Sequence, residues 1–323
     1  MARALLRRLL MAIALLAAPA NSALAQSCSF GIDSLSFGSI DVTTNTAFTT
    51  GGTYSASCSG ILLSAVRTCP NVGAGTSGGH ASGNPRYLVS GANQLEYNLY
   101  SDPSHTTVWG SRLWAGSAPP TDITVVILGS GNTSRPMYAR IPPGQQAVPP
   151  GTYTSSFAGG HTAVTYGAYL LGILPPPNCA TLASPSGTAP FTVTATVVAA
   201  CTVSATLLDF GTTGVLHAAI DAANSLSVTC SATVPYSVSL DGGLSGAADP
   251  TLRKMQKASE TVTYGLYRDA ARTQPWGSSI GTNTAAGTGS GFAQPFSVYG
   301  RVPAQATPSP GTYTDTIVAT VTY

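Results

Sequence analysis

Charged side chains are scarce in this sequence and make up 8% of its 323 residues. Lysine occurs only at Lys254 and Lys257. Setting aside the N-terminal Arg3, Arg7 and Arg8 from the 14 basic residues leaves 11, against 12 acidic ones. A nearly neutral chain with no basic stripe lacks the electrostatic footprint of a nucleic-acid-binding protein. The sequence therefore predicts no nucleic-acid partner.

Residue patterns typical of catalytic and metal sites are also missing. There is no Cys-x-x-Cys or Ser-x-x-Lys motif, and no carboxylate pair recurs beside an aromatic cleft. The histidines are scattered, and none has a second histidine or a carboxylate at metal-ligand spacing; they are His80, His105, His161 and His217. We therefore expect no enzymatic activity, no catalytic residue, no metal and no cofactor.

Long apolar runs are confined to the N-terminus. Arg3, Arg7 and Arg8 precede the apolar stretch Leu9–Ala18, and Ala23-Leu-Ala25 fits a small-x-small cleavage site. This order is typical of a secretory signal peptide, because the apolar stretch is too short to span a bilayer. We expect residues 1–25 to be removed and the chain to be exported through the periplasm to an extracellular location.

Six cysteines follow this leader, and an even number in an exported chain favours disulfides. They are Cys28, Cys58, Cys69, Cys179, Cys201 and Cys230. Cys28–Cys58 and Cys201–Cys230 have nearly the same spacing, so we expect each pair to be bridged. Cys69 and Cys179 then remain for a third bridge.

The rest of the chain contains one long module twice. Collinear matches connect Leu35–Gly38 with Leu208–Gly211, Trp109-Gly-Ser111 with Trp276-Gly-Ser278, Tyr138–Pro142 with Tyr299–Pro303, and Gly151–Thr154 with Gly311–Thr314. A repeat this long indicates two domains rather than a solenoid. Trp109 and Trp276 recur as predicted core residues, Asp102 and Asp269 as turn residues, and Arg140 and Arg301 as structural residues of the sheet.

Alternation of apolar and polar residues predicts strands throughout both copies, and no helical stripe interrupts them. Phe191–Val197 is the strictest case: Phe191, Val193, Ala195 and Val197 alternate with threonines. The C-terminal stretch also alternates and stops while still in a strand pattern; its apolar face is Ile317, Ala319, Val321 and Tyr323. A long neutral edge strand can pair with another chain, so we interpret this face as an acceptor edge.

Cys201–Gly211, Thr263–Asp269 with Trp276-Gly277, and Pro310–Asp315 resemble the spore coat protein U domain. This domain occurs in pilins of archaic (Csu-type) chaperone–usher pili. The resemblance implies an all-β fold of two immunoglobulin-like β-sandwich domains in tandem, at residues 26–189 and 190–323, the second lacking its last strand. Family pilins are completed by a neighbour's donor strand, which is β-strand addition. Residues 191–199 hold the donor position ahead of Cys201, and we expect this strand to complete the first domain.

Only Gln26 and Ser27 would precede Cys28 after cleavage, so the first domain has no donor strand ahead of it. A subunit that accepts a donor strand but offers none from its N-terminus resembles the two-domain tip adhesin of Csu-type pili. The resemblance implies surface attachment and biofilm formation from the pilus tip. It also implies four partners: a neighbouring pilin subunit, a periplasmic chaperone, an outer-membrane usher, and an abiotic or host surface.

Apolar residues present only in the first copy are candidates for the surface-binding loops, because exposed apolar patches usually mark interaction sites. They are Leu62, Leu63, Leu113, Trp114 and Val148. The residues around Leu62 and Leu63 also fit a core strand. Two other functions stay open: a structural spore or cell-surface coat protein without an adhesive role, and a secreted carbohydrate-binding module.

Overall fold

The computed structural model describes residues 27–60, 64–80, 84–114, 120–127, 129–183 and 186–323. The expected signal peptide and its cleavage site lie outside the described residues. The described part contains two short 3-10 helices, η1 (Val42–Thr44) and η2 (Gly159–Thr162), and otherwise strands, turns and loops. None of these described elements is a helix of the length and hydropathy needed to cross a membrane. The prediction of an all-β protein is confirmed.

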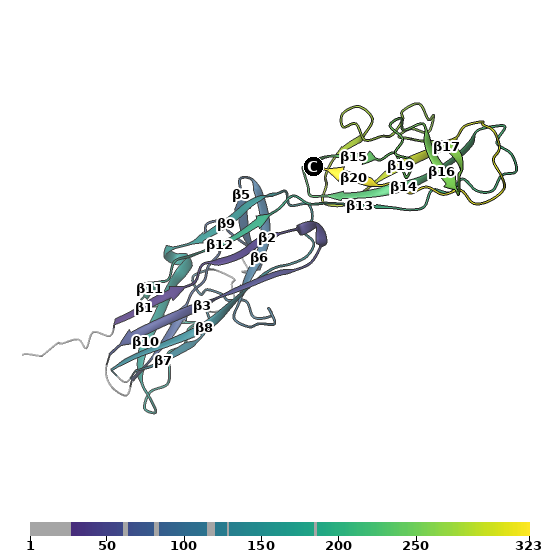
Figure 1. The fold of residues 1–323 in the computed structure, drawn as a ribbon. Coiled ribbons are helices and arrows are strands. Elements are labelled where there is room, and N and C mark those ends of the chain that lie inside the picture. The colour runs from purple at the N-terminus through teal and green to yellow at the C-terminus, as the bar shows by residue number, and fades with distance from the viewer. Residues whose placement is uncertain (1–26, 61–63, 81–83, 115–119, 128, 184–185) are drawn as a thin grey trace, which may run out of the picture.

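Two lobes follow one another along the chain and are joined after β12 (Figure 1). In the first, an eight-stranded sheet has the order β1-β3-β8-β6-β5-β9-β12-β2 and faces a four-stranded sheet of order β11-β10-β4-β7. The strand bounds are β1 Ser27–Ile32, β2 Leu35–Ile40, β3 Phe48–Ser59, β4 Ser64–Pro70, β5 Arg86–Ser90, β6 Asn93–Tyr100, β7 Ile123–Ile127, β8 Ser130–Ile141, β9 Gly151–Phe157, β10 Ala163–Leu170, β11 Ser186–Thr188 and β12 Phe191–Val197.

The second lobe repeats this plan with fewer strands. A five-stranded sheet has the order β13-β14-β19-β17-β16, and a three-stranded sheet has the order β18-β15-β20. The bounds are β13 Cys201–Ala205, β14 Ile220–Cys230, β15 Pro235–Leu240, β16 Arg253–Lys257, β17 Glu260–Tyr267, β18 Ala285–Thr288, β19 Ala293–Val302 and β20 Ala319–Thr322.

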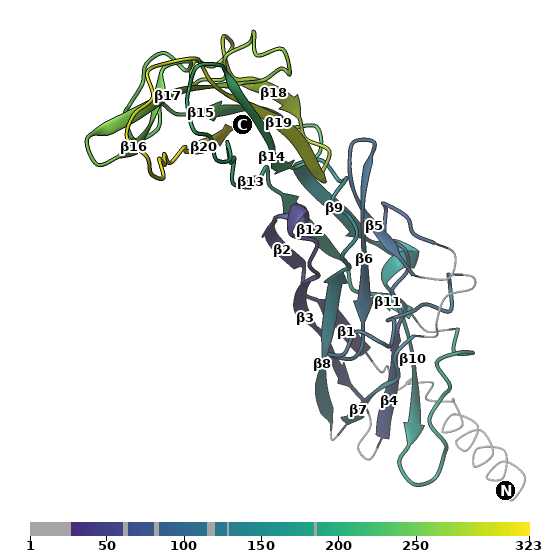
Figure 2. The ribbon, with the colours of Figure 1, turned by 90° about the vertical axis from the view of Figure 1, so that its right-hand side faces the viewer.

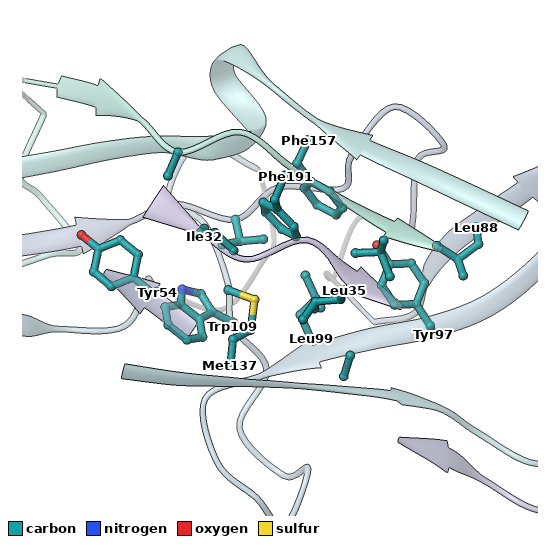
Figure 3. Close-up of a cluster of buried hydrophobic side chains, with 14 of the residues drawn as sticks. Ile32, Leu35, Tyr54, Leu88, Tyr97, Leu99, Trp109, Met137, Phe157 and Phe191 are labelled. Atoms are coloured by element: carbon teal, nitrogen blue, oxygen red, sulfur yellow. The ribbon is translucent and has the colours of Figure 1, made fainter. Parts of the chain in front are cut away.

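Each lobe has its own apolar core, formed where the inward faces of its two sheets meet. Alternation determines which side chains enter the core, because successive residues of a strand point to opposite faces. In β12 the apolar residues are buried, whereas the intervening threonines are exposed or half-buried. Figure 3 shows the centre of the first core, where Trp109, Tyr54 and Met137 lie beside Leu99 and Leu35.

The predicted core role of Trp109 and Trp276 is confirmed, since both side chains are buried. Each indole N–H donates to a carbonyl of the facing sheet, that of Pro70 or Val238, at 3.0 and 2.9 Å. Each tryptophan also accepts, through its backbone carbonyl, a hydrogen bond from a buried arginine, Arg86 or Arg253. Burial lowers the pKa of Arg86 to about 10, which still leaves the guanidinium charged at neutral pH.

Strand pairing defines the two ends of the first lobe. Gly151 pairs with Val197, and Phe48 pairs with Ile141, so these residues lie at the end from which the chain leaves for the second lobe. Ser59 pairs with Ser130, and Ser64 pairs with both Ile127 and Leu170, at the opposite end. We call these the linker end and the distal end. In Figures 1 and 2 the tips of β7 and β10 point away from the second lobe.

Candidate functional site

Strand β12 lies between β9 and β2 in the eight-stranded sheet. It pairs antiparallel with β9 from Phe191–Phe157 to Val197–Gly151, and parallel with β2 from Val193–Leu35 to Val197–Ile40. Hydrogen bonding on both edges makes β12 an interior strand, although it follows β9 by more than 30 residues of chain. The segment predicted as a donor strand therefore occupies a place in the first lobe.

The four apolar side chains of β12 belong to the core of the first lobe: Phe191, Val193, Ala195 and Val197 are all buried. Phe191 stacks on Phe157 with ring centroids 4.3 Å apart (Figure 3). Full burial of a large apolar side chain contributes about 1.5–3 kcal/mol. The three larger side chains alone therefore supply a substantial part of a domain's typical net stability of about 5–15 kcal/mol.

The second lobe has counterparts of both neighbours of β12. Thr314 bridges Gln256 of β16, as Thr154 of β9 bridges Val89 of β5. Residues 311–317 thus correspond to β9, and by the repeat residues 208–213 correspond to β2. Apart from that single bridge, neither segment is in a strand, and no described strand of this chain lies between them. The second lobe therefore has an open position where the first lobe holds β12; we call it the open groove.

Burial differs at matching positions of the two lobes. Leu35 of β2 and Tyr153 and Phe157 of β9 are buried on the strands that flank β12. Their counterparts Leu208, Tyr313 and Ile317 are only partly buried, although they pack against the second core. Phe210 of the same groove is half-buried, as is its counterpart Phe37 in the first lobe. The open groove thus presents a row of apolar side chains at the rim of an otherwise closed core.

The four residues of the predicted acceptor edge lie in three different structural contexts. Ala319 and Val321 are half-buried in β20, which pairs with β15 and forms the edge of the three-stranded sheet. Ile317 lines the open groove. Tyr323 is exposed at 58%. Val321-Thr-Tyr323 matches Val164-Thr-Tyr166 of β10, so β9 with β10 in one lobe corresponds to residues 311–322 in the other.

Among the described residues of the first lobe, a loop at the distal end carries several exposed apolar side chains. After β10 the chain turns at Leu170, whose carbonyl accepts the amides of Ile173 and Leu174 at 3.2 and 3.1 Å. The exposed fractions are 42% for Leu171, 75% for Ile173 and 54% for Leu174. We call residues 170–182 the tip loop.

Three sets of contacts hold the tip loop in place. Pro177 packs on β10 so closely that a β-carbon at Gly167 would lie 3.0 Å from its Cγ. The Cys69–Cys179 disulfide attaches the returning chain to β4. The Asn178 carbonyl accepts the amides of Thr181 and Leu182 at 3.1 and 2.9 Å. Apolar side chains on a braced loop lose little further conformational freedom on binding, which favours contact with a surface.

The predicted surface residues that the structure describes lie in two different places. Leu62 and Leu63 are outside the described residues, although the flanking Ser59 and Ser64 are at the distal end. Leu113 is exposed at 48%, whereas Trp114 is half-buried above Arg86, whose guanidinium carbon lies 5.3 Å from the ring centroid. Val148 packs against the first core in the loop leading to Gly151, which places it at the linker end.

Sequence reasoning did not select the tip loop, because residues 167–189 read equally well as a linker or as an extra strand pair. One signal could have identified it. Leu170, Leu171, Ile173 and Leu174 form an apolar cluster directly before Pro175-Pro-Pro177, beyond the last residue that matches the second copy. An apolar cluster beyond the repeated core, ahead of prolines that end a strand, indicates an exposed loop.

All three predicted disulfides are present: Cys28–Cys58, Cys69–Cys179 and Cys201–Cys230. Cys69 and Cys179 lie near Asp122, but bridged cysteines offer no thiolate to a metal. Asp122 instead pairs with Arg67 at 2.7 Å. The expectation that no catalytic motif is present was wrong in one case, since Gly75–Gly79 fits the Gly-x-Ser-x-Gly pattern of hydrolases. The Ser77 hydroxyl donates to the Thr154 carbonyl at 2.7 Å and holds a loop against β9.

The repeated aspartates have the predicted turn role. Asp102 accepts the amides of Thr106 and Thr107, and Asp269 accepts those of Thr273 and Gln274. Partial desolvation opposes the charged form of Asp102, but the donors of Thr107 and Thr106 outweigh it and lower its pKa to about 2. Arg301 has a structural partner as expected, since it holds Asp221 at 2.8 Å across β14 and β19.

These features define an all-β protein of two related domains, one holding an inserted strand and one with the matching position open. Residues 14–159 and 187–320 match the Spore Coat Protein U domain. The chain therefore belongs to the Spore Coat Protein U domain family. Protein U of Myxococcus xanthus is 40% identical over 105 residues, which cover 31% of this chain and 58% of that protein. The chain thus spans less than two thirds of that relative's length.

One solved structure supports the two-domain arrangement, and a second is more distantly similar. The chaperone–tip adhesion subunit complex CsuC–CsuE from Csu pili of Acinetobacter baumannii matches over 92% of this chain and 100% of the other, with a TM-score of 0.51 and 15% identity. The CupB6 tip adhesin of Pseudomonas aeruginosa matches over 92% and 94% of the two chains, with a TM-score of 0.38 and 12% identity. The fold is thus similar to that of the CsuE tip adhesin.

Proposed function

We propose that this protein is the tip subunit of a chaperone–usher pilus and attaches it to surfaces. The observation that carries the proposal is the contrast between the domains: β12 fills one groove from within the chain, and the corresponding groove of the second domain is open. A subunit built this way can accept a strand from a neighbour while its own donor-like strand is already used. Such a subunit belongs at the end of a fibre.

Joining the shaft would occur by donor-strand complementation at the open groove. Its walls are residues 208–213 and 311–317, and their half-buried apolar side chains match those that β12 covers in the first domain. Before assembly the groove would need a temporary cover, because an unpaired edge beside exposed apolar side chains aggregates. A periplasmic chaperone would supply that cover and an outer-membrane usher would export the subunit; CsuE, whose fold is similar, was solved with the chaperone CsuC.

Attachment would occur through the distal end of the first domain, farthest from the shaft. The tip loop offers Leu171, Ile173 and Leu174 there, and its braces keep them exposed. Among the residues selected from the sequence, Leu62 and Leu63 lie outside the described residues; the strand ends that flank them, at Ser59 and Ser64, belong to this end. Trp114 lies over Arg86 and Val148 packs on the core at the linker end, so the proposed contact includes neither of them, nor Leu113 beside Trp114.

Thermal unfolding of the mature chain with a C-terminal extension tests the proposal. The extension consists of a Gly/Ser linker as long as residues 167–190, which connect Tyr166 to β12 in the first domain, followed by a copy of Phe191–Ala199. Filling the groove should raise the melting temperature of the second domain by about 10 °C or more, since 1 kcal/mol shifts a small domain by about 4–8 °C. The matched control carries aspartate at the positions of Val193 and Val197 in the extension. Equal melting with both extensions would mean that no groove is open, and the pilus assignment would fail.

A coat protein without adhesive role is the second candidate, and the match to Protein U of Myxococcus xanthus favours it. The two functions differ in where the protein accumulates. Immunogold labelling should find a tip subunit in few copies at fibre ends, and a coat protein over the whole surface.

A further inference from the structure

Two residues at equivalent positions distinguish the groove of the second domain from that of the first. Ser155 of β9 is buried, and Gly75 approaches its hydroxyl so closely that a β-carbon there would collide with it. Asp315 has the same relation to Gly243, and both glycines have positive φ, +78° and +67°. The adjacent Thr154 and Thr314 make the equivalent bridges described above. The second domain therefore places a carboxylate where the first places a hydroxyl.

In the first domain this position faces the inserted strand. Val193 of β12 is the cross-strand partner of Ser155, and both side chains point into the core. Directly opposed residues of an antiparallel pair have β-carbons about 4.5–5.5 Å apart. A strand entering the open groove in the register of β12 would thus place one inward side chain against Asp315.

Asp315 already has three hydrogen-bond donors. The Tyr264 hydroxyl donates to Oδ2 at 2.6 Å, and the amides of Leu244 and Thr316 donate to Oδ1 at 2.8 Å each. A carboxylate has about four acceptor sites, so Oδ2 has capacity for one more donor, and Asp315 is only half-buried in the open groove. The buried guanidinium of Arg253 lies close enough to interact electrostatically with Asp315.

The residue facing Asp315 therefore decides how well a strand fits. A valine would bury the remaining acceptor site against methyl groups, and an unsatisfied buried acceptor beside a charge is unfavourable. A threonine has almost the same shape and can donate its hydroxyl proton to Oδ2. Serine or asparagine would also supply a donor.

We propose that Asp315 makes the open groove selective for a donor strand that carries threonine, serine or asparagine opposite it. The occupant is an extended, alternating segment of a different polypeptide. The remaining inward residues follow β12: apolar opposite Ile317, small opposite Tyr313 and apolar opposite Gly311. The β12 segment of a second copy has Val193 at the selective position and is buried in its own first domain, so subunits of this kind do not join one another. This inference rests on the proposed function, because it needs the groove to accept a strand.

Two synthetic peptides and the mature full-length chain test the selectivity. One peptide has the sequence of Phe191–Ala199, and the other carries the nearly isosteric change Val193→Thr. Binding is measured by calorimetry and by the rise in melting temperature. We expect the Val193→Thr peptide to bind the wild-type chain about tenfold more tightly than the unchanged peptide. In an Asp315→Ser chain the preference should vanish or reverse, because the groove then presents the serine that Val193 already faces in the first domain.

A matched control separates selectivity from stability. Thr316→Ser changes an exposed neighbour of Asp315 and should keep the tenfold preference. If Asp315→Ser impairs folding, the peptide ratio on the wild-type chain still decides. Tight and equal binding of both peptides would leave the groove in place and overturn the role of Asp315. Binding of neither peptide would overturn both this inference and the proposed function.

Discussion

Phe191 stacks on Phe157 at a centroid distance of 4.3 Å and an interplanar angle of 9°, and this contact joins β12 to β9 at the start of their pairing. The two residues lie on opposite sides of the tip loop in the sequence. Their stacking therefore joins the two ends of the segment 158–190, which contains β10, the tip loop and β11.

A charge within β12 should unfold the first domain. Val193 is fully buried between β9 and β2, so Val193→Asp loses its apolar burial and places a carboxylate in the core. We expect a loss of about 3–5 kcal/mol in the free energy of unfolding of the first domain. Denaturant titration measures it, with Thr192→Asp as the control because Thr192 faces outward on the same strand. Equal unfolding of Val193→Asp and wild type would contradict the assignment of β12 to this core.

Removing apolar side chains from the tip loop should weaken attachment without affecting the fold. Ile173→Asp combined with Leu174→Asp changes two side chains that are mostly exposed. We expect binding to polystyrene or hydrophobic beads to fall about tenfold or more, since each buried aliphatic side chain contributes about 1.5–3 kcal/mol. The melting temperature should stay within a few degrees of wild type.

The control for this variant is Ile280→Asp, which removes an isoleucine of 63% exposure from the second domain. It should bind surfaces as well as wild type. Equal loss in both variants would show that general surface hydrophobicity, and not the tip loop, drives attachment.

Opening the Cys69–Cys179 bridge should release the tip loop. The bridge closes a sequence separation of 110 residues, and removing a native disulfide typically costs about 2–5 kcal/mol. The double variant Cys69→Ser/Cys179→Ser should therefore be less stable in its first domain and be cleaved by chymotrypsin near Leu171 and Leu174. The paired variant Cys201→Ser/Cys230→Ser should leave this cleavage unchanged, because its bridge lies in the second domain. Resistance of the first double variant to cleavage would show that Pro177 and Asn178 brace the loop on their own.

Acid should remove the contribution of the Asp102 turn. The pKa of Asp102 is lowered to about 2 by the donors of Thr107 and Thr106, which outweigh desolvation. A group whose pKa is depressed by folding adds stability above its unfolded pKa of about 3.9 and loses it as the pH falls through the folded value. Asp102→Asn should thus be less stable than wild type at pH 7, and the difference should shrink between about pH 4 and pH 2. A constant difference across this window, measured by urea unfolding at each pH, would mean that the charge of Asp102 plays no part.

Much of the architecture could be predicted from the sequence. The repeat located Trp109 and Trp276 in the cores, and it paired Cys28 with Cys58 and Cys201 with Cys230. The strict alternation of Phe191–Val197 predicted which side chains of that strand are buried, because the two faces of a strand are determined by residue order alone. The candidate binding surface was harder to predict from the sequence. Trp114 stood between glycine and proline in the pattern of an exposed loop, yet in three dimensions it covers the Arg86 guanidinium.

By itself, the sequence determined the strand pattern, the two copies and the side chains that each strand directs inward, because these follow from local periodicity and from matching residues. Only the tertiary structure decided where β12 lies, which groove stays open, which apolar residues gather at the distal end, and that Asp315 lies against Gly243 as Ser155 lies against Gly75. These depend on pairing between segments far apart in the chain. Leu171 and Val148 look alike as apolar loop residues, and only the fold puts one at the distal tip and the other beside the linker.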